Sequence, residues 1–185
     1  MGSQQHTSAH TIRTQPTYPK ALLVMWTWLP TTGADVPHMV QMAEDHFQTE
    51  IDLIFTPDPI AYARNLTQAT VAQFYNPQAE LLTVAKHTET GAILAYTWAI
   101  RGEKTAWSDQ EMVFARMAHV DLSLPVRQRL RLVTGMILQW ETWARECGVR
   151  IVCSTTMRRD QAGFLDLHRK LGYDVRGSYC YKRLD

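Results

Sequence analysis

The stretch that decides the fold covers residues 111–148 and reads EMVFARMAHVDLSLPVRQRLRLVTGMILQWETWARECG. An apolar run typical of a strand leads into a short connection that contains Pro125, and a helix follows. Pro125 suits the first helical turn, because its missing N–H would have no partner there. Apolar side chains then recur every three or four residues, which places on one helix face Leu130, Val133, Ile137, Trp140 and Ala144. The stretch therefore predicts a strand followed by an amphipathic helix.

Three arginines, Arg127, Arg129 and Arg131, gather at the start of this predicted helix. That end of a helix carries a positive partial charge, so cations placed there lose about 0.3–1 kcal/mol each. Backbone N–H groups and guanidinium groups that converge on one point are suited to a bound polyanion. A solvent-exposed arginine cluster without any ligand is the alternative, and these residues alone leave both open.

Composition limits the class of protein. At 185 residues and 45% hydrophobic content, the chain can bury one sizeable core, and a net charge of +1 predicts neither a nucleic-acid nor a membrane partner. The chain has no uninterrupted apolar run of about 18 residues, and its N-terminus lacks the apolar segment of a secretory signal. Three cysteines without CxxC spacing favour buried thiols over a disulfide framework or a metal site. We therefore expect a cytoplasmic protein without a metal.

The rest of the chain predicts a flexible arm at residues 1–19 and one domain at residues 20–185. Before the strand at 111–122 we expect a strand at 20–29, a helix capped by Asp35, a helix from Asp58-Pro59 to Asn76, strands at 80–87 and 92–100 joined by a turn at 88–91, and a polar loop at 103–110 containing Trp107. After the central helix we expect a strand at 150–156, a helix at 161–170 closed by Gly172, and a strand at 173–184 with a bulge at Gly177. A helical crossover joins the strand at 111–122 to the strand at 150–156, so these two should be parallel. The order predicts an α/β fold with a mixed sheet and helices on both faces.

The C-terminal sequence FLDLHRKLGYDVRGSYCYKRL, at 164–184, resembles the GNAT superfamily of N-acetyltransferases. Its LHRKLGY portion is similar to the family's last helix and Lys-x-Gly-aromatic exit, and ARECGVRIV at 144–152 is similar to the helix end and strand that follow the cofactor loop. The resemblance covers residues 20–184 and implies a mostly antiparallel, twisted sheet whose parallel strand pair splays apart. It also implies an acyltransferase that uses acetyl-CoA and acetylates a primary amine of a small molecule or protein by direct attack on the thioester. An inactive GNAT-like module that binds a protein partner is the alternative, and a homodimer is left open.

The resemblance further implies where acetyl-CoA binds. Its pantetheine would pair with the free edge of the strand over residues 117–122, and its pyrophosphate would bind at the start of the following helix. The family's Gln/Arg-x-x-Gly-x-Gly/Ala pattern matches from Gln128 onward, but Arg131 and Val133 stand where the two glycines belong. Arginine side chains would then have to hold the phosphates. The candidate cofactor-binding residues are Val120, Leu122, Arg127, Gln128, Arg129, Arg131, Leu132, Val133 and Thr134.

Proton transfer has three candidate residues. The family often places a tyrosine in the last helix to protonate the leaving thiolate; the matching residue is His168, whose ordinary pKa near 6.5 suits this task. For the base, His119 is the first choice, directly or through water, and Glu111 is the second. Strand alternation places His119 and Asp121 on the same face. Purely structural roles for all three candidates, and attack without a dedicated base, remain alternatives.

Overall fold

The structure, a computed structural model, describes residues 25–49, 55–158 and 161–177. Its elements are, in chain order, β1 (Trp26–Pro30), the 3₁₀ turn η1 (Gly33–Asp35), α1 (Val36–Thr49), α2 (Pro59–Tyr75), β2 (Glu80–His87), β3 (Ile93–Thr105), β4 (Ser108–Val120), α3 (Val126–Glu146), β5 (Ile151–Ser154) and α4 (Ala162–Lys170). The predicted arm at 1–19 and residues 20–24 of the predicted first strand lie outside the described residues.

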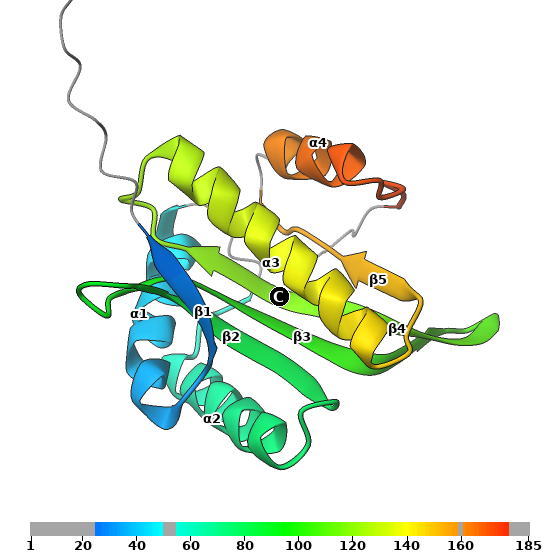
Figure 1. The fold of residues 1–185 in the computed structure, drawn as a ribbon, viewed down its shortest axis with the longest axis horizontal. Helices are drawn as coiled ribbons and strands as arrows, with labels where there is room; N and C mark the ends of the chain where they lie inside the picture. Colours follow the sequence, from blue (N-terminus) through cyan, green and yellow to red (C-terminus); the bar gives the residue numbers. More distant parts are fainter. Residues whose placement is uncertain (1–24, 50–54, 159–160, 178–185) are drawn as a thin grey trace, which may run out of the picture.

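The strands form one sheet in the order β1-β2-β3-β4-β5 (Figure 1). Strands β1 to β4 pair antiparallel with their neighbours, and β5 pairs parallel with β4. Helix α3 is the crossover between the parallel strands, as the chain order requires. The predicted α/β fold, with a mixed and mostly antiparallel sheet, is confirmed.

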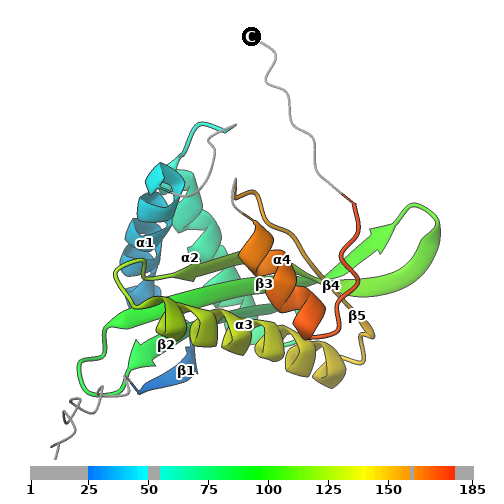
Figure 2. The ribbon, with the colours of Figure 1, turned by 90° about the horizontal axis from the view of Figure 1, so that it is seen from above.

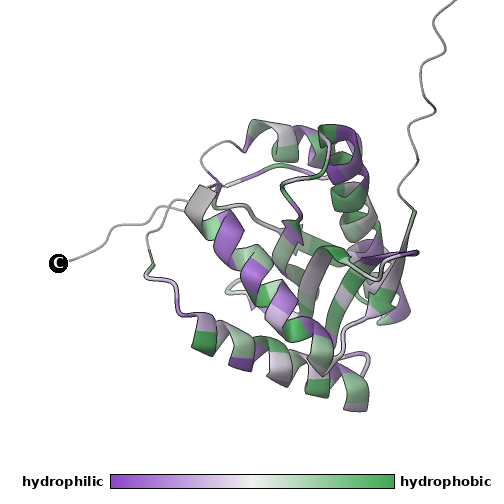
Figure 3. Ribbon diagram, turned by 90° about the vertical axis from the view of Figure 1, so that its left-hand side faces the viewer, coloured by the Kyte–Doolittle hydropathy of each residue, from purple (hydrophilic) through white to green (hydrophobic). Residues whose placement is uncertain are grey.

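Helices cover both faces of the sheet and produce two cores (Figure 2). One core packs α1 and α2 against β2 and β3 around Met39, Leu66 and Tyr96. The other packs α3 against β3 and β4, and residues of α4 join it at its border. The strands are largely hydrophobic, whereas the helices alternate hydrophobic and hydrophilic residues along their lengths, as amphipathic helices do (Figure 3).

The two helices on the first face begin differently. Helix α2 begins as predicted, because the Asp58 carboxylate accepts a hydrogen bond from the Ala61 N–H at 2.9 Å and Pro59 occupies the first turn. Asp35, predicted as a helix cap, instead closes the 3₁₀ turn before α1: its carboxylate accepts from the N–H and hydroxyl of Thr32 and pairs with Lys86 at 2.6 Å. Burial alone would raise the pKa of Asp35, but these partners hold it below its ordinary value.

The prediction of a polar loop at residues 103–110 is wrong. Strand β3 continues to Thr105 and β4 begins at Ser108, so a hairpin extends through this segment with Ala106 and Trp107 at its tip. The Trp107 side chain is 87% exposed. Because the hairpin tip is exposed to solvent, its strands need no apolar residues, and the sequence pattern that marks a half-buried strand is absent.

The end of the chain departs from prediction in part. Gly172 has φ of +88° directly after α4, as expected for the residue that closes a helix. Residues 173–177 form no strand, so the predicted strand and its bulge at Gly177 are absent from this segment. The remainder of the predicted strand, residues 178–184, lies outside the described residues.

Candidate active site

The pairing of β4 changes on both of its edges at one place. On one edge the ladder with β5 ends at the pair Ala115–Ser154. On the other edge Ala115 pairs with Ala99 and Met117 with Trp98, which leaves Arg116 as the extra residue of a bulge. We call the neighbourhood of Ala115, Arg116 and Ser154 the parting point. Beyond it β4 continues to Val120 while β5 ends, so the ladder no longer joins the two strands.

A chain of two hydrogen bonds beside the bulge holds it in place. The Trp140 indole N–H donates to the Thr97 hydroxyl at 2.7 Å, and this hydroxyl donates to the Met117 carbonyl at 3.0 Å. Helix α3, β3 and β4 are thereby tied together beside the parting point. The guanidinium of Arg116 lies over the ring of Trp98, 5.0 Å from its centre.

His168 lies beside the parting point, on the face of the sheet that α3 covers. Its Nδ1 is 2.9 Å from the Phe164 carbonyl, and its Nε2 is 2.7 Å from the Ser154 hydroxyl. A carbonyl can only accept, so Nδ1 carries the proton and Nε2 accepts from Ser154. Only 3% of the residue is exposed, and this burial lowers its pKa despite the opposing bond to Phe164. His168 is therefore neutral at pH 7, and its hydrogen bond to Ser154 connects it to the parting point.

Ser154 was not among the predicted site residues. The sequence RIVCSTT correctly indicated a strand, but nothing in it distinguishes Ser154 from the threonines that follow. The contact with His168 forms only because α4 packs beside the end of β5. A serine near the end of a strand that enters a predicted site is the one signal that could have drawn attention to it.

His119 lies on the opposite face of the sheet. Its ring contacts the rings of His46 and Tyr96, with centres 4.7 and 5.0 Å away, and the residue is 3% exposed. Neither ring nitrogen has a hydrogen-bond partner among the described residues. Burial, with added repulsion from His46 and Arg158, holds its pKa well below 6.5, so the imidazole is neutral at pH 7. Buried polar atoms are normally satisfied, so this ring is suited to a water molecule or a polar ligand group.

His46 and Arg158 link β4 to the segment that follows β5. His46 Nε2 donates to the Val120 carbonyl at 2.6 Å, and Arg158 donates to His46 Nδ1 at 3.0 Å. Asp121 N donates to Leu94 of β3, so the backbone of Val120 faces the other edge of β4. The Val120 carbonyl, a predicted pantetheine partner, thus already accepts a hydrogen bond from the protein itself.

The start of α3 presents both backbone and cationic groups. Its N-cap residue is Pro125, and no side chain caps the helix. Arg127 and Arg131 are exposed and lie one turn apart on the same face, whereas Arg129 is half-buried. Gln128 is also half-buried, and its Oε1 is a buried atom without a hydrogen-bond partner among the described residues. Arg127 and Arg131 are therefore the two arginines here best exposed to an anion.

Other predicted cofactor residues lie farther into α3. Leu132 is fully buried, Val133 packs at the border of the same core, and the Thr134 hydroxyl donates to the Leu130 carbonyl at 2.8 Å. Because α3 already begins at Val126, these residues belong to its second and third turns. Their amides therefore do not face the open end of the helix. Leu122 is half-buried in the connection between β4 and α3.

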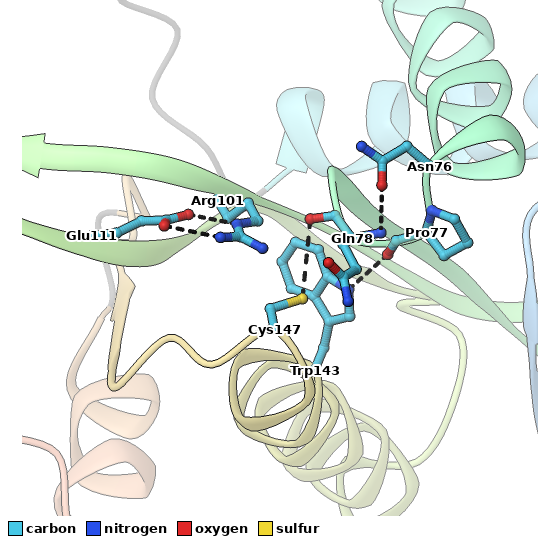
Figure 4. Close-up of polar contacts among 7 residues, drawn as sticks. All are labelled: Asn76, Pro77, Gln78, Arg101, Glu111, Trp143 and Cys147. Atoms are coloured by element: carbon cyan, nitrogen blue, oxygen red, sulfur yellow. Dashed lines mark hydrogen bonds and ion pairs between the residues drawn. The ribbon is translucent and has the colours of Figure 1, made fainter.

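Glu111 lies near the other end of β4. Its carboxylate forms two contacts with the Arg101 guanidinium, at 2.5 and 3.0 Å, as Figure 4 shows. The hydrogen bond from Arg101 is the main reason that the pKa of Glu111 is below its ordinary value. Four residues of strand, about 13 Å, separate Glu111 from Ala115. The structure therefore does not bring Glu111 together with His119 or His168.

The described residues contain no group of three or more His, Cys, Asp or Glu side chains placed to hold a metal ion. Among the helices that the structure describes, none combines the length and apolar character needed to cross a membrane. A groove of about 840 Å³ lies along the C-terminal half of α3 and the start of β5, and Tyr173 is among its lining residues. This groove adjoins Arg150, Ile151 and Val152, and the parting point is at the other end of β5.

Comparison with known proteins is informative through structure alone, since neither a family model nor a curated protein sequence matches this chain. An acetyltransferase of Trypanosoma brucei superimposes with a TM-score of 0.56 at 16% identity, over 87% of this chain and 99% of that one. An aminoglycoside antibiotic 6'-N-acetyltransferase of Acinetobacter haemolyticus gives 0.60 at 17% identity, over 86% and 99%. Glucosamine-6-phosphate N-acetyltransferase of Arabidopsis thaliana gives 0.62 at 12% identity, over 87% and 99%. Together with the bulged β4 and its parting from β5, these likenesses show that this chain has the fold of the GNAT N-acetyltransferases.

Proposed function

We propose that this protein is an acetyl-CoA-dependent N-acetyltransferase that moves an acetyl group to a primary amine of a small molecule or protein. The amine attacks the thioester directly. One observation carries the proposal: the bulge in β4 and the end of its ladder with β5 coincide at the parting point. The backbone N–H groups of a bulged strand are free of regular pairing, and such groups can stabilise the oxyanion that forms when a thioester is attacked.

Acetyl-CoA has a coherent place in this structure. Its pantetheine would follow the edge of β4 beyond Ala115, where the ladder with β5 has ended. Its pyrophosphate would bind at the uncapped start of α3. Arg127 and Arg131 would bind the phosphates there, because this chain lacks the glycines that would let phosphate approach the backbone closely. A structure with a TM-score of 0.61 to this chain, a predicted acetyltransferase of Clostridium acetobutylicum, contains acetyl-CoA. This supports the same cosubstrate here.

The two buried histidines divide the proton transfers in this proposal. An amine acceptor is protonated at neutral pH and must lose a proton before it attacks. His119 is neutral, has no hydrogen-bond partner for its ring among the described residues and lies on the α1 side of β4, so it is the proposed base, directly or through water. His168 lies on the α3 side and serves the departing thiolate. Glu111, held by Arg101 at a distance, has no part in the proposed chemistry.

Of the two acceptor classes, a small-molecule amine is the preferred proposal. Two of the proteins with this fold are named for aminoglycosides and for glucosamine 6-phosphate, both of which carry primary amines on sugar rings. Purified protein would be mixed with acetyl-CoA and either neamine, glucosamine 6-phosphate or a lysine-containing peptide, and the released CoA thiol would be measured. We expect amine-dependent release with at least one of these classes. Release that no amine increases would contradict the proposal.

A non-catalytic module that binds a protein partner is the second candidate. It is favoured by His46, which already occupies the Val120 carbonyl, and by the lack of glycines at the start of α3. The two candidates differ in their response to acetyl-CoA. A catalytic protein binds it and gains thermal stability by mass action, whereas a module that has lost the site shows no change in melting temperature at millimolar acetyl-CoA.

A further inference from the structure

We propose that Ser154 is a catalytic residue that returns a proton to the departing CoA thiolate, and that His168 positions it. This inference rests on the proposed acetyl transfer and deepens it. Ser154 forms the last pair of the β4–β5 ladder, at the parting point where the thioester would lie. Its hydroxyl is 2.7 Å from His168 Nε2. Ser154 is half-buried and His168 is buried, so Ser154 is the member of the pair that a ligand can reach.

The direction of the hydrogen bond determines what each member can do. The Phe164 carbonyl fixes the proton of His168 on Nδ1, so the Ser154 hydroxyl must donate to Nε2. Two lone pairs on the Ser154 oxygen then remain for other donors. A hydroxyl whose own proton is held by a base can accept a proton from a neighbour and pass its own proton on. This arrangement of hydroxyl, imidazole and orienting acceptor is complete without any further residue.

Among the described residues, the groups in direct contact with His168 are uncharged at neutral pH. Helix α3 presents Trp140, with ring centres 6.5 Å apart, and β5 presents Ser154. The segment after α4 presents Tyr173, a titratable residue whose ring centre is 4.9 Å from that of His168 and which lies near Glu141 and Arg145. Burial raises the pKa of Tyr173, so this phenol stays neutral near pH 7. Phe164 of α4 itself completes the aromatic enclosure at 4.2 Å.

The protons balance through the whole reaction. His119 or water first removes the extra proton of the ammonium group, and the neutral amine attacks the carbonyl carbon to form a C–N bond. The nitrogen of the tetrahedral intermediate passes a second proton to the Ser154 oxygen, while the Ser154 proton moves to His168 Nε2. As the C–S bond breaks, His168 returns its proton to Ser154, and Ser154 gives one to sulfur. The products are the amide and CoA thiol, and Ser154 and His168 regain their initial states.

Single variants test the role of Ser154, with acetyl-CoA and the amine that proves active among neamine, glucosamine 6-phosphate and the lysine peptide. We expect Ser154→Ala to lower kcat about 100-fold, the lower range for loss of a proton-transfer group, with little change in KM for acetyl-CoA. Ser154→Thr keeps a hydroxyl and should retain much of the activity. Ser108→Ala is the matched control, since its hydroxyl lies on the exposed hairpin and only accepts a bond from the Gln110 N–H at 3.1 Å. If Ser154→Ala does not fold, Ser154→Val replaces it, because valine has the shape of threonine and lacks the hydroxyl.

A test of His168 must distinguish its proposed proton exchange with Ser154 from a purely structural role in packing. In His168→Gln a side-chain oxygen can still accept from Ser154 but cannot hold a proton, so kcat should fall as far as in Ser154→Ala. The double variant should be no slower than either single variant, because the two groups act as one unit. Nitrogen NMR of the wild-type imidazole should show the proton on Nδ1, and Ser154→Ala should change the His168 pKa.

The outcomes separate this inference from the proposed function. A wild-type protein without amine-dependent activity would overturn both. An active wild-type protein with unchanged kcat in folded Ser154→Ala or Ser154→Val would overturn the role of Ser154 and leave acetyl transfer intact. A proton found on His168 Nε2, or additive losses in the double variant, would overturn the coupled pair.

Discussion

At the scale of single residues, the proposed site contains two histidines that burial keeps neutral. His119 and His168 lie on opposite faces of the sheet, and the pKa of each is below its ordinary value because burial disfavours the charged ring. They differ in their partners: His168 is bonded at both nitrogens, whereas neither nitrogen of His119 has a hydrogen-bond partner among the described residues. In the proposed mechanism His119 therefore acts on a ligand directly, and His168 acts through Ser154.

The burial of His119 predicts a loss of stability in acid. In the unfolded chain His119 takes up a proton near pH 6.5, whereas in the folded protein it stays neutral until a lower pH. The free energy of unfolding should therefore fall as pH drops below about 6.5. Urea unfolding between pH 8 and pH 5 should show a shallower fall in His119→Phe than in wild type. His38→Phe, at an exposed position of α1, is the control. Equal slopes in His119→Phe and wild type would mean that His119 is not buried as described.

Candidate site residues could be chosen from the sequence, but the residues that they contact in the fold could not be predicted from it. His168 and His119 were singled out by their chemistry and by the family resemblance. Ser154, His46 and Arg158 were not, because each is brought to the site by an element far away in the chain. A single sequence carries no signal for such contacts, which depend on how helices pack on the sheet.

At the scale of elements, the bulge of β4 depends on a polar link to α3. Met117 accepts from Thr97, and Thr97 accepts from the indole of Trp140. Trp140 is almost wholly buried and Met117 is partly buried, so the Thr97 hydroxyl satisfies two groups at once. The shape of β4 at the parting point is therefore set by β3 and α3 together.

Thr97→Val should destabilise the protein and disturb the bulge. The substitution leaves the Trp140 N–H and the Met117 carbonyl without this partner, at a cost of about 1–3 kcal/mol for the buried Trp140 N–H. Denaturant unfolding should show a loss of at least about 1 kcal/mol. Thr27→Val, at an exposed position of β1, should stay within about 0.5 kcal/mol of wild type. A Thr97→Val protein as stable as wild type would show that this chain of hydrogen bonds does not hold the bulge.

The start of α3 is the element that should decide cofactor affinity. Arg127→Ala and Arg131→Ala should each weaken acetyl-CoA binding about tenfold, the effect expected when one charge-assisted hydrogen bond is lost. CoA without its 3′-phosphate should also bind less well if these arginines reach that group. Titration calorimetry would measure each affinity. Arg145→Ala, at the other end of α3, is the control, since Arg145 pairs with Glu141 at 2.9 Å. An unchanged affinity in both N-terminal variants would remove the proposed role of the arginines.

Elements with a buried face could be predicted well, and exposed ones could not. The three- and four-residue spacing identified α3, and the Asp58-Pro59 pair identified the start of α2. The hairpin between β3 and β4 was missed, because residues 103–110 are exposed and polar on both faces. The glycine pattern of the family also led to candidates inside α3, since Pro125 begins the helix earlier than that pattern implies.

At the scale of the whole molecule, the order of elements carried most of the fold prediction. Alternating strands and helices, with one helical crossover, require a mixed sheet covered on both faces, and the structure has this arrangement. The predicted parting of the parallel pair could also be anticipated, and the proposed site is placed at that point. What the order of elements could not predict is that α1 and the segment after β5 reach the same edge of β4 through His46 and Arg158.

We propose that this chain binds acetyl-CoA beside β4, beyond the parting point, with its phosphates at the start of α3. Titration calorimetry of the full chain with acetyl-CoA measures this binding. We expect saturable binding at one site per chain, weakened when Arg127 and Arg131 are both replaced by alanine. A wild-type protein that gives no binding heat and no rise in melting temperature at millimolar acetyl-CoA would contradict it.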